Sequence, residues 1–406
     1  MVAKQTKIIA VVVVVLLIAV AILAVVLVPS SNNTKTGYRI VANVNKDCAG
    51  TPWFVGEDIG YFARGGIDFV DAGALDWSLQ PAALISGQTN VYDGHPNTLI
   101  NLLESGAKIK GVVMGSIDPD DYNLTEQHMH WLVLSSSGIK TIHDLVANGS
   151  KPKIAVGAEG ICADLENNAW FRQNNLTKDD FQYVVLSDPL QEAALRAGQI
   201  DVAVLHPPFY TAAEAHGGVT IVAKSEDTLG IYAGVSMLAF TEDFIQKNPD
   251  AVRAFIIAYK NAERWSNDWR EQSGQLTAGR IGLTTANSHY YSYSGAINDT
   301  AIQVWIDAMV ADGLLKKGQY VPSDLYTTEF SDTWVAPTQK QPLNPFGLST
   351  LINSTWVNQT GATTTYSSYD AYVISQGTTN NLYADVEKNL NTGNIVQPRS
   401  SSSRDW

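Results

Sequence analysis

Two cysteines and two histidines are the side chains in this sequence that are best suited to chemistry. Cys48 and Cys162 are the only cysteines, and His95 and His206 each stand directly before a proline. In an oxidising compartment the cysteines could form a disulfide if their Cα atoms lie within ~7 Å. They could equally remain free thiols beside a ligand, or be buried away from it. A further hypothesis is that all four side chains converge on a soft metal ion such as Zn²⁺ or Cu⁺, because such ions prefer thiolate and imidazole ligands.

The two histidines occupy equivalent positions of an internal repeat. Residues 80–96 read QPAALISGQTNVYDGHP and residues 191–207 read QEAALRAGQIDVAVLHP, an offset of 111 residues (191 − 80) with nine of 17 positions identical. Each copy predicts a short helix that ends at a glycine, then a strand, then a break at the His-Pro pair, since proline cannot extend a strand ladder. The repeat therefore implies two similar lobes, with His95 and His206 facing each other across a shared cleft.

Short strands and helices alternate in the region around the repeat. This alternation predicts an α/β fold with parallel sheets, in which ligands bind beyond the carboxyl ends of the strands. The expected boundaries are 37–118 with 228–330 for lobe 1 and 119–227 for lobe 2, the chain returning to lobe 1 through 231–240. The expected elements include strands at 38–44, 67–71, 153–156 and 181–186 and helices at 52–64, 162–174, 249–265 and 300–311.

Several segments resemble a known family of binding proteins. The segment PWFVGEDIGYFARGGIDFV (52–70) resembles the opening of ABC-transporter solute-binding proteins of the sulfonate, taurine and nitrate class. That family's AL-x-x-G-x-x-D-V segment is similar to residues 83–91, where Asn90 replaces the Asp, and to residues 194–202. Its I-x-x-x-x-D-L segment is similar to residues 139–145, and its K-I-A-V-G segment to residues 153–157. The resemblance covers about 38–330. It implies a two-lobe periplasmic-binding-protein-like fold (type II), a hinged clamp that delivers a small solute to an ABC permease. Related members bind thiamine-pyrimidine precursors or bicarbonate, so the family does not identify the ligand.

Equivalent loops of the two lobes supply further candidates for ligand contacts. Free backbone N–H groups at helix starts suit an anion, aromatic rings offer walls or a cation–π face, and an acidic side chain would pair with an ammonium group. This mixture predicts a small organic anion or a zwitterion such as taurine. Besides Cys48, His95, Cys162 and His206, the candidates are Thr51, Trp53, Trp77, Ser78, Glu159, Gly160, Tyr210 and Tyr232. Each also has a purely structural interpretation, and the remaining histidines (His128, His130, His143, His216 and His289) are interpreted as structural or surface residues.

A hydrophobic segment near the N-terminus predicts a membrane anchor. Ile8–Val28 contains 21 consecutive apolar residues (28 − 8 + 1), enough to span a ~30 Å hydrocarbon core. Lys4 and Lys7 precede it, which places the N-terminus inside the cell and the rest of the chain outside. A cleaved signal peptide is the alternative, but its apolar core would be shorter. Sequons that agree with an exported, glycosylated chain lie at Asn32, Asn123, Asn148, Asn175, Asn298, Asn353 and Asn358.

Composition and missing motifs narrow the function. A formal net charge of −13 excludes a nucleic-acid partner, which needs a basic face. The sequence contains no Gly-x-Ser-x-Gly or His-Glu-x-x-His motif, so we expect neither an enzyme nor a cofactor. The Ser/Thr/Asn-rich extension 331–406 is a packed addition, a partner-binding arm or a tether. The alternative to a solute-binding protein is a structural protein of the cell envelope that self-assembles into a lattice or filament on the same scaffold.

Overall fold

The computed structural model describes residues 37–76, 78–118, 127–283, 289–335 and 339–345, together with the backbone of two short strands at 355–357 and 363–365. The predicted membrane segment Ile8–Val28 and most of the extension 331–406 lie outside these residues. Within the described ranges, every helix is too short or too polar to cross a bilayer.

Lobe 1 is built on five strands in the order β2-β1-β3-β11-β4. β1 (Tyr38–Ala42) runs parallel to β2 (Ile67–Asp71), and β11 (Met237–Thr241) runs antiparallel to both β3 (Val91–Gly94) and β4 (Ile109–Met114). β1 and β3 are joined by Asn90, whose backbone N–H donates to the Val41 carbonyl at 3.0 Å. β11 is the strand by which the chain returns to lobe 1, as the sequence predicted.

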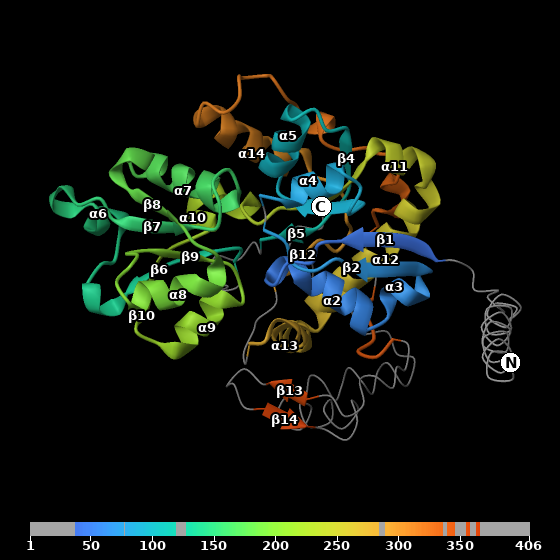
Figure 1. Cartoon of the computed structure of the whole chain (residues 1–406), viewed down its shortest axis with the longest axis horizontal. Coiled ribbons are helices and arrows are strands. Elements are labelled where there is room, and N and C mark those ends of the chain that lie inside the picture. Colours follow the sequence, from blue (N-terminus) through green and yellow to red (C-terminus); the bar gives the residue numbers. More distant parts are fainter. Residues whose placement is uncertain are drawn as a thin grey trace, which may run out of the picture. The chain divides into compact units, whose positions relative to one another are not determined.

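Lobe 2 repeats this topology with the order β8-β7-β9-β6-β10. β7 (Lys153–Val156) runs parallel to β8 (Gln182–Val185), and β6 (His130–Leu134) runs antiparallel to both β9 (Ala203–Leu205) and β10 (Val219–Lys224). A single bridge between Ile154 and Val202 joins β7 to β9. The elements of lobe 2 form the green group in Figure 1. Since both sheets place one antiparallel strand beside the third strand, the internal repeat extends to the whole sheet.

Equivalent side chains of the two repeats accept a hydrogen bond from the first strand of each sheet. Asn90 Oδ1 accepts a hydrogen bond from the backbone N–H of Val41 at 2.9 Å. Asp201, 111 residues later (201 − 90), accepts one from the backbone N–H of Lys153 through Oδ2 at 2.7 Å. The Asp of the motif AL-x-x-G-x-x-D-V therefore has a structural role, and Asn90 performs it equally well because only an acceptor oxygen is required.

Helices cover both faces of each sheet, because strand side chains point alternately to opposite faces. In lobe 2, Trp131 and Val133 pack on the α7 side, while Leu132 packs on the side of α8 and α9. In lobe 1, α2, α3 and α12 cover one face, and α5 and α14 cover the other. The helices of lobe 2 are α6 (Ile142–Leu145), α7 (Cys162–Gln173), α8 (Asp188–Arg196), α9 (Phe209–His216) and α10 (Glu226–Leu229). Those of lobe 1 are α2 (Thr51–Asp58), α3 (Tyr61–Arg64), α4 (Gln80–Ile85), α5 (Pro96–Glu104), α11 (Glu242–Lys247), α12 (Pro249–Asp268), α13 (Arg270–Ile281) and α14 (Asp299–Ala311).

Two helical regions differ from the sequence prediction. The expected helix 52–64 is divided into α2 and α3 at Gly60, whose φ of 96° lies in the left-handed region that a residue without Cβ adopts without strain. The expected helix 249–265 continues to Asp268, and α13 follows it directly although the sequence analysis did not predict that helix.

The described connections leave and re-enter lobe 1 beside each other. The chain leaves through β5 (Ser116–Ile117), which pairs with β12 (Tyr290–Tyr291), and it returns through α10 and residues 230–236. The first part of the extension packs on lobe 1. Trp265 Nε1 donates to the Leu343 carbonyl at 2.9 Å, and Leu343 is fully buried. Farther along, β13 (Thr355–Val357) pairs antiparallel with β14 (Thr363–Thr365). The described start of the extension is therefore a packed addition to lobe 1.

Candidate functional site: a cavity between the lobes

A cavity lies between the two lobes and is lined by loops of both. Its lining residues are Asp47, Cys48, Ala49, Asp93, Gly94, His95, Thr98, Ser116, Ser236 and His289 of lobe 1, and His128, Ile161, Cys162 and His206 of lobe 2. The space not filled by protein atoms is about 500 Å³, a figure that includes the part open to solvent. None of these described lining residues is a lysine or an arginine.

Strand ends and helix starts bring the four predicted residues to this cavity. His95 and His206 follow β3 and β9, the equivalent strands of the repeat, and His95 is the N-cap of α5. Cys162 is the first residue of α7, and Cys48 begins a short 3₁₀ turn after β1. The predicted meeting of His95 and His206 at one cleft is observed. Both cysteines are free thiols, so the disulfide considered from the sequence is not formed.

The buried imidazole of His95 is neutral and has a defined tautomer. Its Nδ1 lies 2.7 Å from the Val235 carbonyl, which can only accept, so Nδ1 carries the proton and Nε2 keeps a lone pair. Burial lowers the pKa of His95 to about 4, and proximity to His206 contributes to the lowering. The ring stacks on Trp305 with 5.0 Å between centroids, which holds its orientation.

His128 is buried without a hydrogen bond to either ring nitrogen. Its residue is 3% exposed, and neither Nδ1 nor Nε2 has a partner within the described part of the chain. Nε2 lies 3.8 Å from Glu166 Oε1, but this is not an ion pair. Burial lowers the pKa of His128 well below its ordinary value, and burial raises that of Glu166 well above its own, so both groups are neutral. His128 therefore presents two unsatisfied nitrogen atoms inside the protein.

A chain of side-chain contacts links Cys162, His206 and Asp188. Cys162 Sγ lies 3.5 Å from His206 Nε2, and His206 Nδ1 donates to Asp188 Oδ2 at 2.7 Å. Burial by itself lowers the pKa of His206, but the charges of Asp188 and Cys162 outweigh it and raise the pKa well above its usual value. Asp188 also accepts from the His206 backbone N–H at 2.9 Å, so the carboxylate holds both the ring and the loop.

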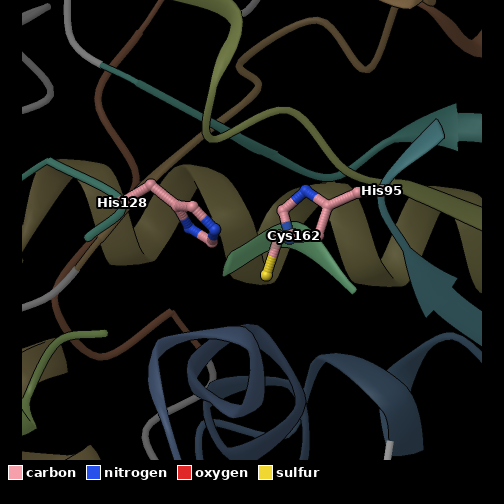
Figure 2. A group of neighbouring side chains, drawn as sticks. All are labelled: His95, His128 and Cys162. Atoms are coloured by element: carbon pink, nitrogen blue, oxygen red, sulfur yellow. The ribbon is translucent and has the colours of Figure 1, made fainter. Parts of the chain in front are cut away.

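The imidazole rings gather around His128. Its ring centroid is 4.7 Å from that of His95, 4.7 Å from that of His206 and 5.6 Å from that of His289. One ligand atom each from His95, His128 and Cys162 can be chosen so that all three lie within 4.8 Å of one another. Figure 2 shows the ring of His128 and the ring of His95 on either side of the Cys162 sulfur. Lobe 1 thus contributes a nitrogen donor, and lobe 2 a nitrogen and a sulfur donor, to one place.

Acidic groups complete the polar lining. Burial raises the pKa of Asp47 to about 6, against the favourable charge of His206. Burial also raises the pKa of Asp93 to about 6. The cavity therefore combines two carboxyl groups with imidazoles and thiols, and none of its described lining residues is a lysine or an arginine.

Hydrogen bonds between the lobes hold this cavity closed. The backbone N–H of Cys48 donates to the Pro207 carbonyl at 2.8 Å, next to the cavity. The Asn97 side chain on α5 donates from Nδ2 to the Gly160 carbonyl in lobe 2 at 3.1 Å. The described structure is thus a closed form of the clamp.

Three predicted ligand contacts belong instead to the protein core. Thr51 is fully buried and bonds to Thr277 at 2.7 Å, because the first turn of α2 faces α13. Trp53 is 3% exposed in an aromatic cluster of lobe 1. Tyr210 is 1% exposed, stacks on His130 at 3.8 Å between centroids and donates to the Gln127 carbonyl at 2.9 Å. None of the three lines the cavity, since their helices turn these side chains into the packed interior of their own lobe.

The other predicted contacts within the described residues do not line the cavity either. Gly160 contributes its carbonyl to the bond between the lobes, and Glu159 beside it is exposed. Tyr232 is half-buried, and its carbonyl accepts from Trp305 Nε1 at 2.8 Å. Ser78 is exposed and bonds to Asp76 at 2.6 Å, which closes a local turn. Trp77 lies outside the described residues.

The predicted glycosylation sites fall in different parts of the chain. Asn175 is exposed at the end of α7, whereas Asn298 is half-buried and caps α14 by accepting from Thr300 and Ala301 backbone N–H groups. Only the backbone of Asn148 is described. Asn32, Asn123, Asn353 and Asn358 lie outside the described residues.

Two histidines of the cavity were not predicted as site residues from the sequence. His128 and His289 were interpreted as structural or surface residues, but both line the cavity and both are buried. His128 stands just before β6 and His289 just before β12, in irregular segments with no periodicity. A usable signal was the position of His128 next to a connection between lobes, since such connections border the cleft.

The class of protein follows from this architecture. Two α/β lobes of equal topology that enclose a cavity define the periplasmic-binding-protein-like fold. Residues 45–282, more than half of the chain, match the NMT1-like family, and the chain belongs to that family.

Known proteins with similar sequence or structure agree with this assignment. The chain is 28% identical over 152 residues to the putative aliphatic sulfonates-binding protein of Escherichia coli K12; the match covers 37% of this chain and 45% of that relative. The nitrate-binding protein NrtA of Synechocystis is similar with a TM-score of 0.60 and 11% identity, covering 81% of this chain and 96% of that one. The ligand-binding component of an ABC-type import system from Staphylococcus aureus, with zinc bound, has a TM-score of 0.59 and 13% identity, covering 74% and 99%. The predicted resemblance to sulfonate and nitrate binding proteins is confirmed at the level of family and fold.

Proposed function

We propose that this protein is the solute-binding component of an ABC import system, which captures a small solute between its lobes and delivers it to a permease. The observation that carries the proposal is the cavity lined by both lobes, with His95 from one repeat and His206 from the other. The curated sulfonate-binding relative and the nitrate-binding structure support it, although the chain spans only about 45% of that relative's length.

Closure of the lobes is the mechanism that this geometry supports. A ligand that touches both lobes favours the closed form, because only that form provides all its contacts at once. The bonds from Cys48 to Pro207 and from Asn97 to Gly160 add to the closed form. Opening about the connections near β5 and α10 would break these bonds and release the solute.

The charged groups that line the cavity indicate which class of ligand it would bind. A sulfonate or another anionic group would be bound by the first turns of α5 and α7 and by the His206 imidazolium. The carboxyl groups of Asp47 and Asp93 face the same space. A simple anion is therefore less well matched than a zwitterion or a cation, which keeps a taurine-like solute as the organic candidate.

The proposed location is outside the cell membrane. The segment Ile8–Val28 would anchor the chain, with its N-terminus inside and the two lobes outside. Protease added to intact cells would digest the lobes if this is right, and would spare them if the lobes were cytoplasmic.

A ligand panel tests the function. The full chain in detergent is titrated calorimetrically with taurine, an alkanesulfonate, nitrate, thiamine-pyrimidine precursors and divalent metal ions. The expected result is saturable binding of one class at one site per chain, and weaker binding by the His206→Ala variant. If no member of the panel bound and mass spectrometry found no solute that co-purified with the protein, the proposal would be overturned.

A further inference from the structure

We propose that His95, His128 and Cys162 bind a single exchangeable, thiophilic metal ion of the Zn²⁺ or Cu⁺ type, and that this ion is the solute on which the lobes close. The inference rests on the proposed solute-binding function and names its ligand class. It goes beyond the predicted hypothesis of a site made by Cys48, Cys162, His95 and His206, because it places His128 at the centre and Cys48 outside the ligand set.

The donor atoms have the right chemistry and nearly the right spacing. Two imidazole nitrogens and one sulfur lie within 4.8 Å of one another. Around a tetrahedral Zn²⁺, bonds of about 2.0 Å to nitrogen and about 2.3 Å to sulfur separate the donors by roughly 3.3–3.7 Å. A contraction on the order of 1 Å therefore suffices, and rotation of the Cys162 and His128 side chains could supply it.

His128 is the independent observation that points to a ligand. A buried polar group without a hydrogen bond destabilises a protein by about 1–3 kcal/mol. Both nitrogens of His128 are in this situation within the described residues, and its ring lies between those of His95 and His206. A metal ion would satisfy one of these nitrogens. Core packing alone would be served equally well by an apolar ring.

The surroundings of the three ligands resemble a second coordination shell. Metal-binding histidines commonly donate their other ring N–H to a carbonyl or a carboxylate, which fixes the tautomer. His95 donates from Nδ1 to Val235 and so turns Nε2 toward the cavity. His206, whose ring is held by Asp188, stands 3.5 Å from the Cys162 sulfur and so borders that ligand atom. The carboxyl groups of Asp47 and Asp93 balance the remaining positive charge of the ion.

Three protein ligands leave one coordination position open. Structural zinc sites usually have four protein ligands, whereas sites that exchange or activate a ligand keep one position for water or a small molecule. His128 and Cys162 come from lobe 2 and His95 comes from lobe 1, so opening of the clamp removes one ligand. The site is thus built to bind the ion tightly when closed and to release it when open.

The row Cys162–His206–Asp188 has a competing interpretation as a nucleophile with its base. A cysteine nucleophile needs one imidazole and an orienting carboxylate, and it has no use for the additional neutral rings of His95 and His128. The metal site accounts for Cys162, His95 and His128 as ligands, with His206 and Asp188 beside them. Alkylation distinguishes the two interpretations, because a bound metal protects the sulfur.

The test is metal binding by the reduced, metal-stripped full chain in detergent. Competition with chromophoric chelators measures affinity for Zn²⁺ and, without oxygen, for Cu⁺, and native mass spectrometry counts the ions. We expect one ion per chain and a loss of affinity of about 100-fold or more in both Cys162→Ser and His128→Ala. The matched control is His216→Ala, which removes an exposed histidine that does not line the cavity; its affinity should stay within about twofold of the parent.

Two further measurements test the metal proposal separately from the proposed solute-binding function. Zn²⁺ should slow alkylation of Cys162 by iodoacetamide, and X-ray scattering should show a more compact protein with the ion than without it. If neither ion binds, or if Cys162→Ser binds as tightly as the parent, the metal proposal is overturned; binding of taurine or a sulfonate in the same preparation would then leave the solute-binding function standing. If the variants unfold, His95→Gln provides the same comparison at the opposite lobe.

Discussion

Truncation of Trp53 should destabilise the protein without weakening its ligand site. The indole is 3% exposed and contacts four aromatic rings, with centroid distances of 6.2 Å to Phe62, 5.5 Å to Phe69, 5.4 Å to Phe255 and 4.9 Å to Tyr259. Replacing a buried Trp by Ala destabilises proteins by about 3–5 kcal/mol, through lost transfer energy and the cavity that remains. That is a large part of a typical unfolding free energy of about 5–15 kcal/mol.

The assay for Trp53→Ala is thermal and urea unfolding alongside ligand titration. At roughly 2 °C per kcal/mol for a protein of this size, the midpoint should fall by about 6–10 °C. Affinity per folded molecule should stay unchanged, because Trp53 does not line the cavity. Trp53→Phe should lose less stability, and Ser78→Ala, at an exposed predicted contact, should change stability by no more than about 0.5 kcal/mol. A variant Trp53→Ala that unfolds like the parent but binds ligand more weakly would refute this reasoning and restore the indole to the site.

Three further predictions each concern one kind of side chain: a buried glutamate, an asparagine between the lobes, and the two cysteines. Burial, reinforced by the charge of Asp93, raises the pKa of Glu263 well above its usual 4.5. The stability that this group contributes is therefore full below about pH 4.5 and falls by up to about 1.4 kcal/mol per pH unit as the pH rises toward the folded pKa. Glu263→Gln should flatten the decline of the unfolding temperature between about pH 5 and pH 8, and parallel curves for variant and parent would contradict this. Asn97→Ala should weaken ligand binding about fivefold, which is equivalent to about 1 kcal/mol for the lost hydrogen bond to Gly160, and should leave the unfolding temperature unchanged. Equal dissociation constants for variant and parent in calorimetry would argue against a closed form held by that bond. Thiol titration of unreduced protein in denaturant should find both cysteines, while fewer than two thiols would indicate a disulfide.

Local patterns were sufficient to predict the elements and their arrangement. The alternation of short strands and helices determined the class of fold, and the repeat at 80–96 and 191–207 determined that there are two lobes of one topology. His95 and His206 could be placed at one cleft because equivalent strand ends of two facing lobes must border the space between them. These predictions depend on chain-neighbour periodicity and on sequence identity between copies, and both are visible without coordinates.

The positions of individual side chains around that cleft depended on tertiary packing. Thr51, Trp53 and Tyr210 occur in the expected segments, but the rotation of each helix about its axis turned them into the core. For Thr51 and Trp53 that rotation is set by the packing of α2 against α12 and α13, whose residues lie more than 190 positions farther along the chain (249 − 58 = 191).

The sequence by itself determined that two repeated lobes present His95 and His206 to a common space. Only the tertiary structure decided that His128 and His289 join them, that Cys162 rather than Thr51 or Trp53 is directed into the cavity, and that His128 has no other partner among the described residues. The physical reason is that the directions of these side chains are fixed by packing between elements and between the two lobes. Such contacts join residues far apart in the chain, and no local pattern records them.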